Sequence, residues 1–214
     1  MILTVDIGNT IIAVGGFEGD MLAFVVRLAT NIKETSHEYA AKLDSILRLS
    51  DTETHSLTAA VISSVVPQLT GTIREALKIA FGIDALSVGP GVKTGINIHC
   101  DDPSSVGADL ICVSVAAAKK YGSPCIIVDM GTATKIIHLG KNGTFEGVAI
   151  LPGAEISLSA LAERTAQLPH IALTAPDSAI GKNTVDSMRS GAVFGAAAAV
   201  DGMIDRFFFE IGEA

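Results

Sequence analysis

The sequence predicts an α/β protein made of two like-folded halves, each with a mixed β-sheet flanked by helices. Two related motifs, Asp6-Ile-Gly-Asn-Thr10 and Asp129-Met-Gly-Thr-Ala-Thr134, lie about half a chain apart, and each follows a short apolar run. Each half opens with strand-like segments joined by turns, and helical patterns follow them. The chain has 214 residues, which is enough for two compact domains with their own cores.

The elements of the first half follow from apolar spacing and turn residues. Two apolar runs form a hairpin around the first motif, and the turn Glu18-Gly-Asp20 leads into a third strand. Tyr39, Leu43 and Leu47 recur at helical spacing, and Val66-Pro67 opens a turn into a second helix. In chain order we expect strands at 2–5, 11–17 and 21–28, a helix at 35–49, a strand at 59–63, a helix at 69–81 and a strand at 85–88.

A long loop joins this half to the next. Residues 89–106 are rich in Gly, Pro, Asn and Asp, and a loop of that length inside a compact protein is usually functional. An apolar helix at 109–121 follows and ends at Gly122, so we expect a first domain of residues 1–118 and a second of residues 119–214. In the second half we expect strands at 125–128, 135–139 and 144–150, then helices at 158–168 and 187–209.

Composition excludes several classes of protein. The net charge is −8 and Lys and Arg form no cluster, which argues against nucleic-acid binding through a basic surface. No apolar stretch approaches the ~20 residues that a membrane span needs. The amino terminus leads straight into a strand, without a signal peptide pattern. The three cysteines lack metal-ligand spacing, and we expect a soluble, cytoplasmic protein in a reducing compartment.

The two motifs have the chemistry of phosphate-binding turns. A glycine two residues after the aspartate lets backbone N–H groups approach an anion, and threonine hydroxyls add further donors. The aspartate is suited to holding a cation or a water beside the phosphates. One such motif is weak evidence, because ordinary strand turns also use Asp, Gly and Thr. Two copies, each after an apolar strand, indicate a single nucleotide held between the halves.

Further motifs run the length of the chain. They are Ser63-Ser-Val-Val-Pro67, Gly89-Pro-Gly-Val-Lys-Thr-Gly95, Gly107-Ala-Asp109, Ile180-Gly-Lys-Asn-Thr184, Met188-x-Ser-Gly191 and Val200-Asp-Gly202. With the two turns, they resemble the type III pantothenate kinase family of the actin-like/hexokinase-like superfamily. The resemblance implies two ribonuclease H-like (actin-like ATPase) domains with a cleft between them. It also implies ATP-dependent phosphorylation of pantothenate to 4′-phosphopantothenate, the first step of coenzyme A biosynthesis.

The resemblance also implies a role for individual residues. Asp109 would be the general base, Asp129 would hold a monovalent cation (K⁺ or NH₄⁺), and Mg²⁺ would accompany ATP. Thr184 would reach the substrate from the neighbouring subunit, so the functional unit would be a homodimer without nucleic-acid or membrane partners. The nucleotide would contact Asp6, Ile7, Gly8, Asn9, Thr10, Ile11, Ile12, Ala13 and Thr132. Pantothenate would contact Cys100, Gly107, Ala108, Asp109, Leu110 and Thr184.

The chain departs from the family pattern at four places. Leu110 replaces an arginine and Cys100 replaces a tyrosine, so two polar groups that suit the substrate are lost. Lys135 replaces a threonine after the second motif, where it either points outward or supplies a positive charge near the phosphates. Family members also continue beyond residue 214 with a strand and a Thr-Gly-Gly turn, so we expect the second domain to be incomplete at its C-terminus.

Two questions stay open at the level of sequence. Asp109 suits a general base, yet an acidic residue in the first turn of a helix also favours the helix dipole without any catalytic role. The substitutions Leu110 and Cys100 keep two alternatives to pantothenate kinase activity in view. One is a weakened or inactive relative that serves as a ligand-binding dimer, and the other is a kinase for another small alcohol.

Overall fold

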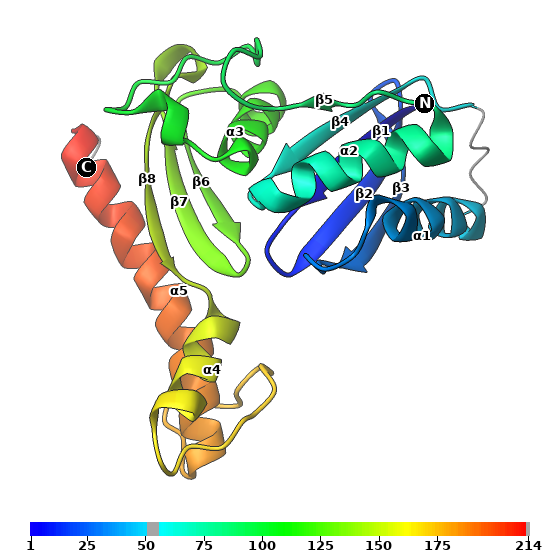
Figure 1. Cartoon of the computed structure of the whole chain (residues 1–214). Coiled ribbons are helices and arrows are strands. Elements are labelled where there is room, and N and C mark those ends of the chain that lie inside the picture. The colour runs from blue at the N-terminus through cyan, green and yellow to red at the C-terminus, as the bar shows by residue number, and fades with distance from the viewer. Residues whose placement is uncertain (51–55, 213–214) are drawn as a thin grey trace. The chain divides into compact units, whose positions relative to one another are not determined.

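The computed structural model describes residues 1–50 and 56–212 (Figure 1). The chain divides into two compact units, one formed by residues 1–95 and 102–113 and the other by residues 96–101 and 114–214. The division falls inside helix α3 (Ala108–Tyr121), a few residues before the domain boundary expected after residue 118. The end of the second domain, at residue 214, lies outside the described residues.

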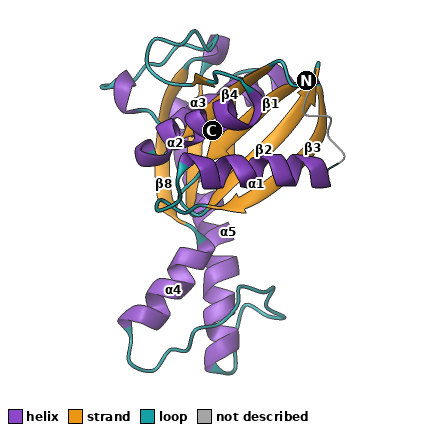
Figure 2. Cartoon of the chain, turned by 45° about the vertical axis from the view of Figure 1, so that its right-hand side comes forward, coloured by secondary structure: helices purple, strands orange, loops and turns teal. Residues whose placement is uncertain are grey.

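A five-stranded mixed sheet forms the centre of the first unit (Figure 2). Its strands are β1 (Ile2–Ile7), β2 (Ile11–Glu18), β3 (Met21–Ala29), β4 (Ala59–Ser64) and β5 (Leu86–Ser87). They lie in the order β3-β2-β1-β4-β5, with β1, β2 and β3 antiparallel and with β4 parallel to both β1 and β5. A meander followed by parallel strands is the arrangement that the apolar pattern predicts.

Side-chain alternation along β1 separates the hydrophobic core from the polar face of the sheet. Leu3, Val5 and Ile7 are buried in a core shared with helices α1 (Ser36–Leu49) and α2 (Pro67–Phe81). Asp6 lies between Val5 and Ile7 in β1, and its register partner in β4 is Ser63. Because successive strand residues point to opposite faces, Asp6 and Ser63 lie on the face away from this core.

Helices α1 and α2 have recognised boundary signals. Thr35 caps α1 in a capping box with Glu38, whose carboxylate accepts hydrogen bonds from the Thr35 backbone and hydroxyl. Pro67 occupies the first turn of α2, where its missing N–H removes no helical bond. Gly82 ends α2 in the left-handed conformation with φ of 68°.

In its described part the second unit holds a three-stranded antiparallel sheet, the C-terminal part of α3 and two further α-helices. Its strands are β6 (Cys125–Met130), β7 (Ala133–Leu139) and β8 (Phe145–Pro152), in the order β6-β7-β8. The helices are α4 (Ala154–Arg164) and α5 (Thr184–Ile211), which pack together through Leu158, Met188 and Ala192. No described helix has both the length and the apolar composition that a membrane span needs.

Helix α4 corrects one expectation. The pattern predicts a helix at 158–168, whereas α4 begins four residues earlier and ends at Arg164. The helix starts directly after β8 because Gly153, its N-cap residue, follows the strand without an intervening loop. Thr165 then has extended backbone dihedral angles, which end the helix. Leu168 still packs against the α4–α5 core from outside the helix, and its apolar side chain produced the misleading pattern.

Candidate active site

The first motif forms a tight turn at the end of β1. The Gly8 N–H donates to the Ile11 carbonyl at 3.0 Å, which closes the turn between β1 and β2. A Cβ atom at Gly8 would lie 2.9 Å from the same carbonyl oxygen, so no larger residue fits without a shift of the backbone. Glycine is therefore required here by close approach of the backbone to itself.

Thr30, at the end of β3, holds this turn from outside. Its hydroxyl donates to the Gly8 carbonyl at 2.7 Å, and its N–H donates to the Thr10 carbonyl at 3.0 Å. Both bonds join residues about twenty positions apart in the sequence. No local sequence pattern identifies Thr30, because the return of the end of β3 to the β1–β2 turn is a feature of the folded sheet.

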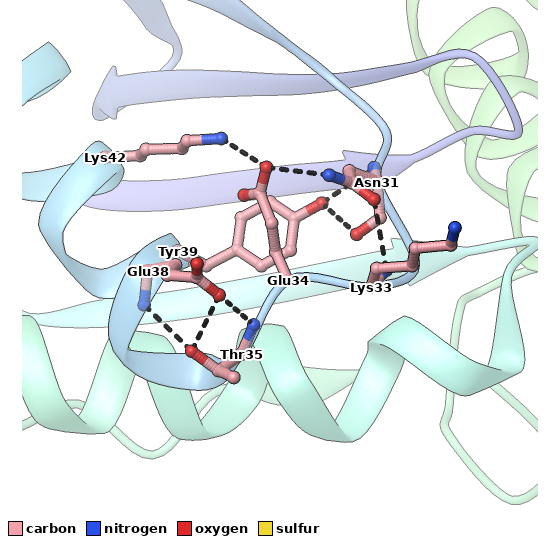
Figure 3. Close-up of polar contacts among 7 residues, drawn as sticks. All are labelled: Asn31, Lys33, Glu34, Thr35, Glu38, Tyr39 and Lys42. Atoms are coloured by element: carbon pink, nitrogen blue, oxygen red, sulfur yellow. Dashed lines mark hydrogen bonds and ion pairs between the residues drawn. The ribbon is translucent and has the colours of Figure 1, made fainter.

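A polar network fixes the segment that follows Thr30 (Figure 3). The Tyr39 hydroxyl donates to the Asn31 carbonyl and accepts from the Asn31 N–H, both at 3.0 Å. The Asn31 amide and the Lys42 ammonium both donate to Glu34, and the hydrogen bond to Glu34 raises the pKa of Lys42. Since Tyr39 is fully buried in α1, the network connects the first turn to the core.

Two carboxylates and two small polar groups gather on the polar face of the first unit. The Ser63 hydroxyl donates to Asp6 at 3.0 Å. Ser63 and the carboxylates of Asp6 and Asp109 all act on the pKa of the Cys112 thiol of α3, which indicates that these side chains lie near one another. Burial raises the pKa of the Cys112 thiol, the bond to Ser63 opposes the rise, and the two carboxylates add to it. The acid of the first turn and the candidate base therefore belong to one local cluster.

Asp109 lies in the first turn of α3 and is partly exposed. A Cβ atom at Gly107 would lie 2.5 Å from an oxygen of the Asp109 carboxylate, so the carboxylate lies close over the Gly107 backbone. The Gly107 carbonyl accepts from the Ile111 N–H at 3.2 Å as the helix begins. The next residue, Leu110, is only 7% exposed, so its side chain lies inside the protein.

The second motif forms the β6–β7 turn of the second unit. The Gly153 N–H donates to the Thr132 carbonyl at 3.1 Å, and a Cβ atom at Gly153 would overlap the carbonyls of Gly131 and Thr132. The turn therefore lies directly against the start of α4. Asp129 faces Lys135 across the two strands, and the Lys135 ammonium donates to the Asp129 carboxylate at 2.7 Å.

Thr184 begins α5 and is exposed. Asn183 caps the helix by accepting from the Asp186 N–H at 2.9 Å, and a Cβ atom at Gly181 would overlap the Ser187 backbone. These requirements explain the Gly-Lys-Asn-Thr sequence at this place. The motif borders a hollow of about 510 Å³ lined by Leu161, Leu168, Gly181, Lys182, Asn183, Thr184, Ser187, Met188 and Gly191.

The site residues expected from the sequence fall into two groups. The first unit contains the whole first motif, residues 6–13, together with Gly107, Ala108, Asp109 and Leu110. The second unit contains Cys100, Asp129, Thr132 and Thr184. Among the described residues there is no group of three or more His, Cys, Asp or Glu side chains that could hold a metal ion.

The fold and the turns formed by the first and second motifs define a class of protein. A mixed sheet with a turn of acid, glycine and hydroxyl after its first strand, and a second such turn in the following unit, is the actin-like ATPase fold. The chain aligns with a protein described as a Baf family transcriptional activator from Campylobacter jejuni (TM-score 0.56, 18% identity, 94% of this chain and 78% of the other). It also aligns with a protein described as a 2-dehydro-3-deoxygalactonokinase from Sinorhizobium meliloti (TM-score 0.50, 15% identity, 77% and 57%). At these identities the likeness concerns the fold alone.

Sequence comparison identifies the family. The model of the type III pantothenate kinase family matches residues 2–206. A type III pantothenate kinase from Shouchella clausii is 43% identical over 96% of this chain and 81% of the relative. Another from an Exiguobacterium species is 41% identical over 100% of this chain and 84% of the relative. The chain belongs to the type III pantothenate kinase family, whose activity is a phosphoryl transfer in coenzyme A biosynthesis.

Proposed function

We propose that this protein transfers the terminal phosphoryl group of ATP to the primary hydroxyl of pantothenate, and that Asp109 is the general base. Family membership makes the protein a pantothenate kinase, and the cluster of Asp6, Ser63, Cys112 and Asp109 supports the choice of base. That cluster is the one observation that carries the assignment, because it indicates that the candidate base lies near the acid of the first phosphate turn.

The two turns would hold the phosphates of ATP. Phosphoryl transfer needs positioning and charge neutralisation more than covalent chemistry, and backbone N–H groups and threonine hydroxyls supply both. Residues 6–13 and Thr132 would both contact the nucleotide. The bonds from Thr30 to Gly8 and Thr10 support this role, since they hold the first turn in one conformation without a ligand.

Asp109 would accept the proton of the pantothenate hydroxyl as the bond to phosphorus forms. A positioned carboxylate typically contributes ~10²–10⁴-fold to such a step. Cys112 has its pKa raised by burial, so it stays a neutral thiol near neutral pH and does not compete for the proton. Asp109 lies in the first turn of α3, where an acidic residue also interacts favourably with the helix dipole, and that interaction does not exclude the proposed catalytic role.

Pantothenate would lie against the start of α3. Gly107 and Ala108 offer backbone there, and the side chain of Leu110 is buried, so this residue would contribute through its backbone or its apolar packing. Cys100 is partly exposed in the loop before α3 and would offer a thiol in place of an aromatic ring. A pocket without the arginine and the tyrosine is expected to bind pantothenate more weakly than a pocket that has both residues of the family pattern. The loss of one charged hydrogen bond costs about 1.5–3 kcal/mol.

The proposed functional unit is a homodimer in which Thr184 acts on the substrate of the neighbouring subunit. Helix α5 supports this, because Gly195 and Gly202 have no atom within 4 Å of an added Cβ atom, which leaves room for close approach of another backbone. Phe194 and Phe209 on the same helix are 43% and 82% exposed. An apolar helix surface of this kind is typical of a protein interface.

Mg²⁺ would enter with ATP, held mainly by the phosphates, with Asp6 as the carboxylate of the first turn, and it would neutralise phosphate charge there. The monovalent cation expected at Asp129 fits this chain less well. The Asp129 carboxylate pairs with Lys135, so a free ion would have to displace or share that ammonium. Localisation in the cytoplasm stays a prediction from the sequence.

The test is a turnover assay with ATP and pantothenate, with the product detected by mass spectrometry. Wild-type protein is expected to form 4′-phosphopantothenate, and Asp109→Asn should lower kcat by ~10²–10⁴-fold while ATP binding by calorimetry stays unchanged. Asp44→Asn, which removes a partly exposed carboxylate that pairs with Arg48 on α1, is the matched control and should keep wild-type activity. Turnover of other primary alcohols but not of pantothenate would support the alternative substrate. Ligand binding without any turnover would support the inactive relative.

A further inference from the structure

Lys135 and Asp129 form an ion pair at the base of the second phosphate turn. The two residues are register partners on the antiparallel strands β6 and β7, so their side chains leave the sheet on the same face. The Lys135 Nζ atom lies 2.7 Å from a carboxylate oxygen of Asp129. The lysine side chain is 20% exposed and the aspartate side chain 35%, so this is not a lysine that extends into solvent.

This arrangement does not suit a free monovalent cation at Asp129. A bound ion of this kind needs oxygen ligands and a net negative surrounding, and the Asp129 carboxylate already has a primary ammonium on it. A second cation on the same carboxylate would meet the repulsion of the lysine charge. No other acidic, histidine or cysteine side chains in the described part of the chain complete a metal cluster there.

We propose that the ammonium of Lys135 takes the place of the monovalent cation, so that the chain carries its own cation at Asp129. The inference rests on the proposed kinase function, since it assigns a role within the second phosphate turn. An ammonium is a compact positive charge with three donors, and NH₄⁺ is one of the two ions expected at this position. Asp129 holds the charge beside residues 130–132, where the turn would meet the phosphates.

The proposal predicts that the enzyme does not depend on added monovalent cations. Wild-type kcat/KM should change by less than about twofold when K⁺ is replaced by tetramethylammonium at constant ionic strength, because the charge is covalently attached. The product should be measured directly by mass spectrometry, since coupling enzymes have ion requirements of their own. Removing the lysine should create a dependence that the wild type lacks.

The decisive variant is Lys135→Thr, with Lys135→Met as a second variant that preserves the length of the side chain. In tetramethylammonium, Lys135→Thr should lose at least about tenfold in kcat/KM, the usual effect of losing a charged hydrogen bond. Addition of K⁺ or NH₄⁺ should recover most of the loss. The melting temperature of Lys135→Thr should be higher in K⁺ than in tetramethylammonium, whereas the melting temperature of the wild type should be the same in both. Lys33→Thr, which removes an exposed lysine of the first unit, is the matched control.

The outcomes separate this inference from the kinase assignment. Wild-type turnover that requires K⁺ would overturn the inference and leave the kinase function in place. A purely structural ion pair would lower the stability of both Lys135 variants without any recovery by cations, and that result would also overturn it. Absence of turnover in every salt would count against the proposed function instead. In that case the effect of K⁺ on the melting temperature still decides the role of Lys135.

Discussion

At the scale of single residues, the interpretation of Cys112 changes most between the sequence and the structure. Its position in an apolar run indicates an ordinary core residue, and it belongs to the first unit with the start of α3. The structure adds that Ser63 and the carboxylates of Asp6 and Asp109 act on the pKa of its thiol. The sequence cannot distinguish a half-buried cysteine near polar groups from a core cysteine. The polar residues near Cys112 belong to strands about fifty and one hundred residues away in the sequence.

Gly8 provides the prediction that belongs to this scale. Gly8→Ala should destabilise the first turn, because the new Cβ atom would lie 2.9 Å from the Ile11 carbonyl and the backbone would have to shift. We expect a loss of about 1–3 kcal/mol in the free energy of unfolding and a higher KM for ATP. Urea unfolding and steady-state kinetics measure the two effects.

The matched control for this change is Gly71→Ala. Gly71 lies in α2, and an added Cβ atom there has no neighbour within 4 Å. Alanine should therefore raise stability by up to about 1 kcal/mol through its better helix propensity, with no effect on KM. Equal effects of the two substitutions would show that the β1–β2 turn tolerates a side chain.

At the scale of elements, apolar alternation and turn residues predict the order of strands and helices in both units. The strongest cases carry their own boundary signals, as Thr35 and Glu38 do for α1 and Pro67 and Gly82 do for α2. Helix α4 was misplaced because Leu168 packs into the same core without being helical. The role of Thr30 was not predictable, since it depends on which strand end meets the first turn. For Lys135 the sequence left two directions of the side chain open, and the register of the β6–β7 hairpin places it opposite Asp129.

Thr30 provides a prediction about the connection between β3 and the first turn. Thr30→Val removes the hydroxyl that donates to the Gly8 carbonyl at 2.7 Å and keeps the shape of the side chain. The free energy of unfolding should fall by about 0.5–1.5 kcal/mol, and KM for ATP should rise because the turn loses its support. Kinetics at varied ATP concentration measure the second effect.

Thr72→Val is the control for the loss of a threonine hydroxyl. Thr72 lies on the surface of α2, and its hydroxyl is at 3.5 Å from the Gln68 carbonyl, a long contact of little strength. This variant should leave KM unchanged. An unchanged KM in Thr30→Val as well would mean that the turn keeps its conformation without the hydroxyl.

At the scale of the whole molecule, the two groups of site residues belong to different units, and Thr184 is proposed to serve a neighbouring subunit. Asp109 belongs to the first unit and Thr184 to the second. The exposed aromatic residues and open glycines of α5 support an interface along this helix. A homodimer in which each active site takes residues from both subunits has a consequence that can be measured by mixing variants.

Asp109→Asn and Thr184→Ala homodimers should each have low activity, and subunit exchange between them should restore part of it. In a mixed dimer, the subunit with Thr184→Ala keeps Asp109 and receives an intact Thr184 from its partner. One of the two active sites of the mixed dimer is therefore complete. Equal amounts and random exchange make about half of the dimers mixed, which gives about a quarter of wild-type activity. If Thr184 served its own subunit, every site would carry one defect and mixing would restore nothing. Size-exclusion chromatography before and after exchange confirms that dimers form, and a monomeric protein would remove the proposed role of Thr184.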